Sequence, residues 1–162
     1  LNLKVAVENV NITTGDNYQP KDYVIRQDPQ GGSKKIDEGS TVTIYVSSGK
    51  YESDIEVSLP QKYKEDVVSL SLWLNGKNIK TSEKLDIKKV SKYTFNDITS
   101  ENKNENYVVM IKGENGTSEE YQTISVDFRK VKGNVTVIST VTFDNVLNNS
   151  SQVPTTDNQV TN

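Results

Sequence analysis

Acidic side chains in adjacent pairs are the first feature of this sequence that could support catalysis. The pairs are Asp37/Glu38, Glu65/Asp66 and Glu119/Glu120. Two carboxyl groups that face one glycosidic bond are what most glycoside hydrolases use. Neighbouring residues on a β-strand, however, point to opposite faces of the sheet. None of these pairs therefore forms a catalytic site as it stands, and we expect no catalytic residue in this chain.

Cysteine and histidine are both absent from the 162 residues. Without them the chain has no thiol nucleophile, no Ser-His or Cys-His dyad, and almost none of the usual zinc ligands. Gly31-Gly32 is not followed by the Lys-Ser/Thr pair of a phosphate-binding loop. The sequence therefore predicts no metal site and no cofactor. The lack of disulfides fits an extracellular domain of a Gram-positive bacterium, although a reduced cytosol would explain it as well.

Charge and hydropathy exclude further classes of partner. The chain carries 19 Lys+Arg and 22 Asp+Glu, a formal net charge of -3. This balance provides no basic field for nucleic acid or for an anionic membrane surface. No stretch approaches the roughly 18 apolar residues of a membrane helix. Because the chain begins at Leu1, we expect it to be a piece of a longer protein whose membrane anchor lies upstream.

Alternation of apolar and polar residues predicts an all-β fold. In residues 41–46, Val42, Ile44 and Val46 share one face, and their neighbours favour strands. We expect strands near residues 3–12, 23–27 and 40–47, with turns at Gly31-Gly32, Gly39 and Ser47-Ser48-Gly49. These elements form a first unit, residues 1–50.

A second unit, residues 51–143, shows strand patterns every eight to twelve residues. Alternating runs occur at 55–59 and 68–74, and further strands are expected at 85–90, 93–98, 107–112, 121–128 and 135–143. Asn75-Gly76 and Asn115-Gly116 are hairpin signals. This spacing predicts an antiparallel β-sandwich without a convincing helix. Residues 144–162 are polar and are expected to form a disordered tail.

One stretch of the first unit resembles a known family, the PASTA repeat. The family pattern is roughly V-I-x-Q-x-P-x-x-G, a short spacer, and G-S-x-V-x-I-x-V-S-x-G. The matching positions are Val24, Ile25, Gln27, Pro29, Gly32, Gly39, Ser40, Val42, Ile44, Val46, Ser47 and Gly49. We interpret Pro29, Gly32, Gly39, Val42, Ile44 and Val46 as structural residues of this motif.

The resemblance implies a location and a partner. PASTA repeats occur outside the cell, on bacterial serine/threonine kinases and on some penicillin-binding proteins, and contact peptidoglycan fragments or wall precursors. A whole repeat begins with a short strand and a helix that covers its sheet, and Leu1 to Val5 resembles the segment just after that helix. We therefore expect the apolar face that includes Val42, Ile44 and Val46 to lack its cover, which permits weak self-association.

The second unit suggests which class of full-length protein contains this chain. Residues 107–113 and 124–128 are similar to the end of the immunoglobulin-like domain that follows the last PASTA repeat in several Firmicute kinases. The resemblance thus implies an ectodomain that senses muropeptides and acts as a spacer at the extracellular face of a bacterial membrane. The chain itself is not expected to be an enzyme. The alternatives are the PASTA region of a penicillin-binding transpeptidase and a structural wall-adhesion module.

Arg26, Gln27 and Tyr45 are the candidate ligand-binding residues. A guanidinium can bind a stem-peptide carboxylate through paired hydrogen bonds, although a solvated strand arginine is the alternative interpretation of Arg26. Gln27 can instead satisfy backbone groups near the turn at Pro29. Trp73 could stack on a wall sugar, but packing against a neighbouring element is the simpler expectation.

Overall fold

Ten β-strands make up the computed structural model, which describes residues 2–12, 19–32, 35–130 and 134–143. The first five are β1 (Lys4–Ile12), β2 (Val24–Asp28), β3 (Thr41–Ser58), β4 (Val67–Leu74) and β5 (Lys77–Thr81). The others are β6 (Leu85–Asp86), β7 (Lys92–Ser100), β8 (Asn104–Gly113), β9 (Glu119–Asp127) and β10 (Val135–Thr140). No helix occurs within the described ranges, so the all-β prediction is confirmed. The predicted tail, 144–162, lies outside them.

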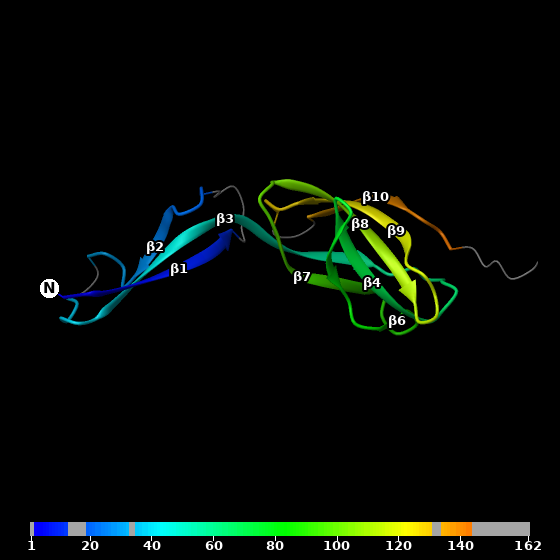
Figure 1. Ribbon diagram of the computed structural model, residues 1–162, viewed down its shortest axis with the longest axis horizontal. Helices are drawn as coiled ribbons and strands as arrows, with labels where there is room; N and C mark the ends of the chain where they lie inside the picture. Colours follow the sequence, from blue (N-terminus) through cyan, green and yellow to red (C-terminus); the bar gives the residue numbers. More distant parts are fainter. Residues whose placement is uncertain (1, 13–18, 33–34, 131–133, 144–162) are drawn as a thin grey trace, which may run out of the picture.

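The first unit folds as a small sheet, here called the N-terminal sheet, formed by β1, β2 and the part of β3 before Tyr51. The central strand is β3, which pairs in parallel with β1 and antiparallel with β2. Figure 1 shows this sheet as the blue and cyan end of an elongated molecule. The strands expected near residues 3–12 and 23–27 correspond to β1 and β2.

The predicted turn at Ser47-Ser48-Gly49 is wrong, because β3 continues through it for 18 residues in all. Gly49 has a φ of 74°, and the register with β1 shifts between Val10 and Ile12. The glycine therefore allows a bulge, in which the strand changes direction without ending. As Figure 1 shows, β3 leads directly from the N-terminal sheet into the second set of strands.

The strands beyond Tyr51 form the predicted β-sandwich. One layer contains the second half of β3 paired with β7, and the other has the order β10-β9-β8-β4-β5, with β6 beside β4. Asn75 and Gly76 have φ values of 50° and 76°, as the hairpin signal between β4 and β5 predicts. The division of the chain at residue 50 stays a prediction, because β3 pairs with β1 and β2 in the first unit and with β7 in the sandwich.

The strand expected at residues 85–90 is much shorter, and this expectation was wrong beyond Asp86. The backbone N–H of Lys88 donates to Asp86 Oδ1 at 3.0 Å, and that of Val90 donates to the Asp86 carbonyl at 3.1 Å. An aspartate that binds backbone N–H groups two residues ahead favours a turn over an extended strand. The local turn therefore ends β6 after two residues.

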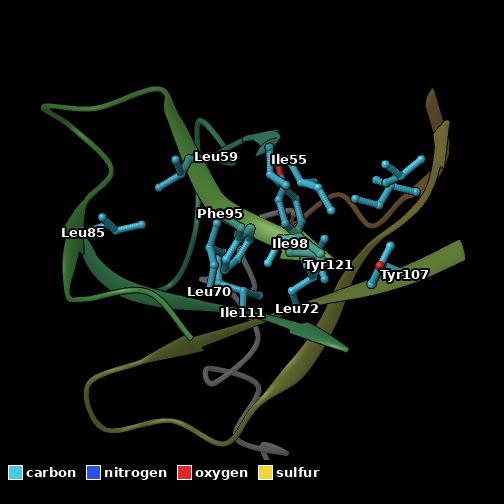
Figure 2. Close-up of a cluster of buried hydrophobic side chains, with 14 of the residues drawn as sticks. Ile55, Leu59, Leu70, Leu72, Leu85, Phe95, Ile98, Tyr107, Ile111 and Tyr121 are labelled. Atoms are coloured by element: carbon cyan, nitrogen blue, oxygen red, sulfur yellow. The ribbon is translucent and has the colours of Figure 1, made fainter. Parts of the chain in front are cut away.

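The core lies between the two layers of the sandwich. Figure 2 shows Ile55, Leu70, Leu72, Phe95 and Ile111 converging there, and each is 0% exposed. The same buried cluster includes Tyr51 from β3 and Ile12 from the end of β1. Because Ile12 belongs to the first unit by sequence, the two units share part of one core.

The apolar face of the N-terminal sheet is uncovered within the described residues. Val5 and Val7 on β1 are 63% and 61% exposed. Their partners on β3, Val42 and Ile44, are half-buried, as is Val46. The three β3 residues are thus better covered than the sequence implied, because strands flank them on both sides.

Replacing Val5 and Val7 together with threonine should reduce surface hydrophobicity with little loss of stability. We expect weaker binding of a hydrophobic dye and less self-association, with a stability change within about 0.5 kcal/mol. Val109→Thr is the matched control, because Val109 is 0% exposed. The same substitution there should cost about 1–3 kcal/mol through its buried hydroxyl. Unchanged dye binding in the Val5/Val7 variant would show that this face is not the surface that binds the dye.

Candidate ligand-binding site

Arg26 and Tyr45 meet on one face of the N-terminal sheet. They are register partners on β2 and β3. The guanidinium carbon of Arg26 lies 3.3 Å from the centroid of the Tyr45 ring. A guanidinium stacked on an aromatic face is held by electrostatic attraction to the ring. The structure therefore brings together two of the three candidate residues predicted from the sequence.

The stacked arrangement leaves the guanidinium able to bind a ligand. Arg26 is exposed, and no ion pair or hydrogen bond engages its side chain within the described part of the chain. Contact with the ring face leaves the N–H donors along the guanidinium edge available to a ligand. That edge matches the two oxygens of a carboxylate. The ring also restricts the side chain, which reduces the rotamer freedom lost on binding.

Gln27 lies next to Arg26 but plays a different part. Its Nε2 donates to the Pro29 carbonyl oxygen at 3.0 Å. Consecutive strand residues alternate in direction, and Gln27 pairs with Ile44 rather than with Tyr45. The geometry favours its architectural role at the turn, so the direct role of Gln27 in binding stays a prediction.

The structural residues of the motif occupy the turns and the central strand. Gly32 and Gly39 have φ values of 78° and 84°, in the left-handed region that glycine adopts without strain. Pro29 follows directly on β2. These residues shape the loops that connect β2 to β3 and thereby set the register that places Arg26 over Tyr45.

The other aromatic residues do not join this site. Tyr51 is 1% exposed and braces the sandwich core, whereas Tyr23 is 57% exposed. Tyr18 lies outside the described residues. Trp73 is half-buried on β4, and its Nε1 donates to Ser71 Oγ at 2.8 Å. The packing interpretation of Trp73 is therefore better supported than a sugar platform.

A polar cluster at the joint between the two sheets was not predicted from the sequence. Asn11 Nδ2 donates to Glu52 Oε2 at 2.6 Å, and Ser48 Oγ donates to Asn11 Oδ1 at 2.6 Å. Nearby, Gly49 packs closely against Lys21. Asn11 and Glu52 are 41 positions apart, so no local pattern could reveal their contact. The cluster ties β1 to β3 where the N-terminal sheet meets the sandwich.

At the end of the sandwich away from the N-terminal sheet, Tyr63, Lys64 and Glu119 form a hydrogen-bonded cluster in which two pKa values are shifted. The hydrogen bond from the Lys64 ammonium, followed by one from the Tyr63 hydroxyl, holds the pKa of Glu119 below its ordinary value. Burial is the main reason that the pKa of Tyr63 is raised. These three side chains join the segment after β3 to β9. They lie away from Arg26, and we interpret them as structural.

Two further classes of site are missing from the described residues. No group of three or more acidic, histidine or cysteine side chains there could hold a metal ion. None of the described elements is a helix long and apolar enough to cross a membrane.

The fold and the site define a modular all-β chain, in which a small sheet with an exposed cation continues through one strand into a sandwich. Residues 1–48 match the PASTA domain family, which confirms the resemblance of the first unit. A comparison with curated proteins found no significant match.

One solved structure is similar, the entire extracellular region of the serine/threonine kinase PrkC from Staphylococcus aureus. The identity is 25% over 73% of this chain, with a TM-score of 0.26. The chain spans 42% of the length of that solved region.

Proposed function

We propose that this chain is an extracellular sensing and spacing module of a membrane-anchored bacterial serine/threonine kinase. The observation that carries the proposal is the match of residues 1–48 to the PASTA domain. A β-sandwich follows that domain directly, which is the order that the sequence resemblance implies for the end of such ectodomains. In this proposal the chain is not catalytic, and kinase chemistry belongs to a domain across the membrane.

A spacing role is supported by the way that the two sheets are joined. β3 passes through both sheets without interruption, and Ile12 and Tyr51 are buried together where they meet. The hydrogen bonds from Asn11 to Glu52 and from Ser48 to Asn11 add to this joint. A joint made by one continuous strand resists bending better than a flexible linker does. Such a rod would hold a binding surface at a defined distance from the membrane.

We propose that the sensing role uses Arg26, stacked on Tyr45, to bind a carboxylate of a peptidoglycan stem peptide. The surface around Arg26 is open, so the attraction should be weak and partly electrostatic. Tyr45 holds the guanidinium in place, and its ring edge offers further apolar contact to a ligand.

Replacing Arg26 with alanine should weaken muropeptide binding by roughly ten- to a hundredfold, the equivalent of one charge-assisted hydrogen bond or pair. The fold should be unaffected, because the side chain is exposed. The measurement is a titration of the chain with soluble muropeptides, followed by NMR chemical shifts. Lys4→Ala removes another exposed cation from the same sheet and is the matched control.

The outcomes of this titration separate the proposed roles. Equal affinities for the parent and Arg26→Ala would remove Arg26 from the site. A complete lack of shifts in both proteins would favour a pure spacer or a wall-adhesion module. The sequence upstream would show whether the full-length protein is instead a transpeptidase. A transpeptidase would contain S-x-x-K and K-T-G motifs there, whereas a kinase would contain a Gly-rich loop and the H-R-D and D-F-G motifs.

A further inference from the structure

A second candidate site lies at the end of the sandwich that adjoins the joint. A hollow of about 620 Å³ opens there between the two layers. We call it the joint hollow and define it by Lys50, Leu74, Lys77, Ile79, Glu101 and Glu105. Lys50 directly follows Gly49 on β3. The other residues come from the β4–β5 hairpin, from the connection between β7 and β8, and from the start of β8. Its volume falls within the range of about 300–1,000 Å³ that is typical of small-molecule sites.

The charges in the joint hollow are balanced but not paired with one another. Within the described residues, no ion pair joins Lys50 or Lys77 to Glu101 or Glu105. Elsewhere on the sandwich, lysines do find acidic partners, as in Lys92–Glu56 at 2.6 Å. The two cations and two anions of the hollow are therefore available to a ligand that carries both signs.

One of the acidic groups is already held in position. Glu105 Oε1 accepts hydrogen bonds from Asn102 Nδ2 at 2.6 Å and from Ser100 Oγ at 3.3 Å. A carboxylate that is fixed before binding loses less rotamer freedom when a cationic group arrives. This anchored group lies at the start of β8, and Glu101 lies in the connection before that strand.

The hollow also has an apolar side. Leu74 packs against the buried core, and Ile79 is 40% exposed. These two apolar side chains can supply contact area to a ligand whose orientation is set by the charged groups around them.

We propose that the joint hollow binds a short zwitterionic peptide. Its carboxylate is bound by Lys50 and Lys77, its ammonium group by Glu101 and Glu105, and a small side chain rests on Ile79 and Leu74. This inference deepens the proposed function, since peptidoglycan stem peptides carry both kinds of charge on short side chains. It places a binding site on the sandwich, separate from Arg26.

Tetra-alanine with free ends is the first probe, because it has both charges and only methyl side chains. An NMR titration of the whole chain should shift the backbone amides of residues 75–79 and 99–105. Tetra-alanine that is acetylated and amidated lacks both charges, and we expect it to cause no shifts there. The double variant Lys50→Gln/Lys77→Gln should bind the free peptide at least about tenfold more weakly. Lys62→Gln, an exposed lysine at the opposite end of the sandwich, should bind as the parent does.

Three results would overturn this inference. They are an absence of shifts at millimolar free peptide, equal shifts with the blocked peptide, and unchanged affinity in the double variant. Thermal unfolding checks that the double variant is folded, as expected for two exposed side chains. A parallel titration with muropeptides separates this inference from the proposed function. Shifts only around Arg26 and Tyr45 would support binding at Arg26 and reject binding in the joint hollow. Shifts only at the joint hollow would support this inference and reject binding at Arg26.

Discussion

Replacing Tyr51 with alanine is expected to lower the free energy of unfolding by about 3–5 kcal/mol, the usual cost of removing a large aromatic side chain from a core. Tyr51 is 1% exposed and belongs to the buried cluster of the sandwich. It is also paired with Ile12 on β1 and with Ser100 on β7. Its loss should therefore loosen both the core and the joint between the two sheets.

Chemical denaturation of the whole chain measures this effect. Tyr45→Ala is the matched control, because Tyr45 lies on the same strand but is only half-buried. We expect that control to cost about 1 kcal/mol, mainly from the lost contact with Arg26. If Tyr51→Ala were no more destabilising than Tyr45→Ala, the joint would not share the sandwich core. If Tyr51→Ala lowered the denaturation midpoint of only one of two separate unfolding transitions, the two units would unfold independently, as a division at residue 50 predicts.

Replacing Gly49 with valine is expected to destabilise the chain by about 2–5 kcal/mol. A φ of 74° lies in the left-handed region, which costs an L-residue roughly 1–2 kcal/mol. A Cβ at this position would also lie 3.0 Å from Lys21 Cβ and 3.2 Å from Lys21 N. Relieving that contact requires the backbone of residue 21 to move, and overpacking of this kind costs about 1–3 kcal/mol.

Gly39→Val separates the two causes of this effect. Gly39 has a φ of 84°, but nothing lies within 4 Å of a Cβ placed there. Gly39→Val should therefore lower the free energy of unfolding only by the cost of the left-handed backbone conformation. The comparison is made by denaturant unfolding of the two variants under the same conditions. Equal losses would mean that the close approach to Lys21 does not constrain the joint.

Local patterns in the sequence predicted most of the strands. The alternation of Val68, Leu70 and Leu72 with polar residues has a period of two, and these three side chains are indeed at most 1% exposed. Asn75-Gly76 also predicted its hairpin, because a tight turn of this type needs two residues that tolerate positive φ. Such features depend on residues within a few positions of one another, so they can be recognised from the sequence.

The same local reasoning failed where distant contacts decide the outcome. Ser47-Ser48-Gly49 has the composition of a turn, yet these residues continue β3, because β1 and β2 pair with the strand up to the bulge and β7 pairs with it beyond. Residues 85–90 have apolar strand formers, yet the strand stops where the Asp86 side chain accepts the backbone N–H of Lys88 and the Asp86 carbonyl accepts that of Val90. Composition alone does not say which of these interactions wins.

For the candidate site, patterns in the sequence were enough to predict the family motif, the all-β fold and Arg26 as the candidate cation. The tertiary structure decided that Tyr45 supports Arg26 and that Gln27 turns toward Pro29. It also decided that Lys50 and Lys77, 27 positions apart by number, line one hollow. The physical reason is that strand pairing and sheet packing join residues by register across the fold, and register depends on every strand of the sheet rather than on the neighbours of one residue.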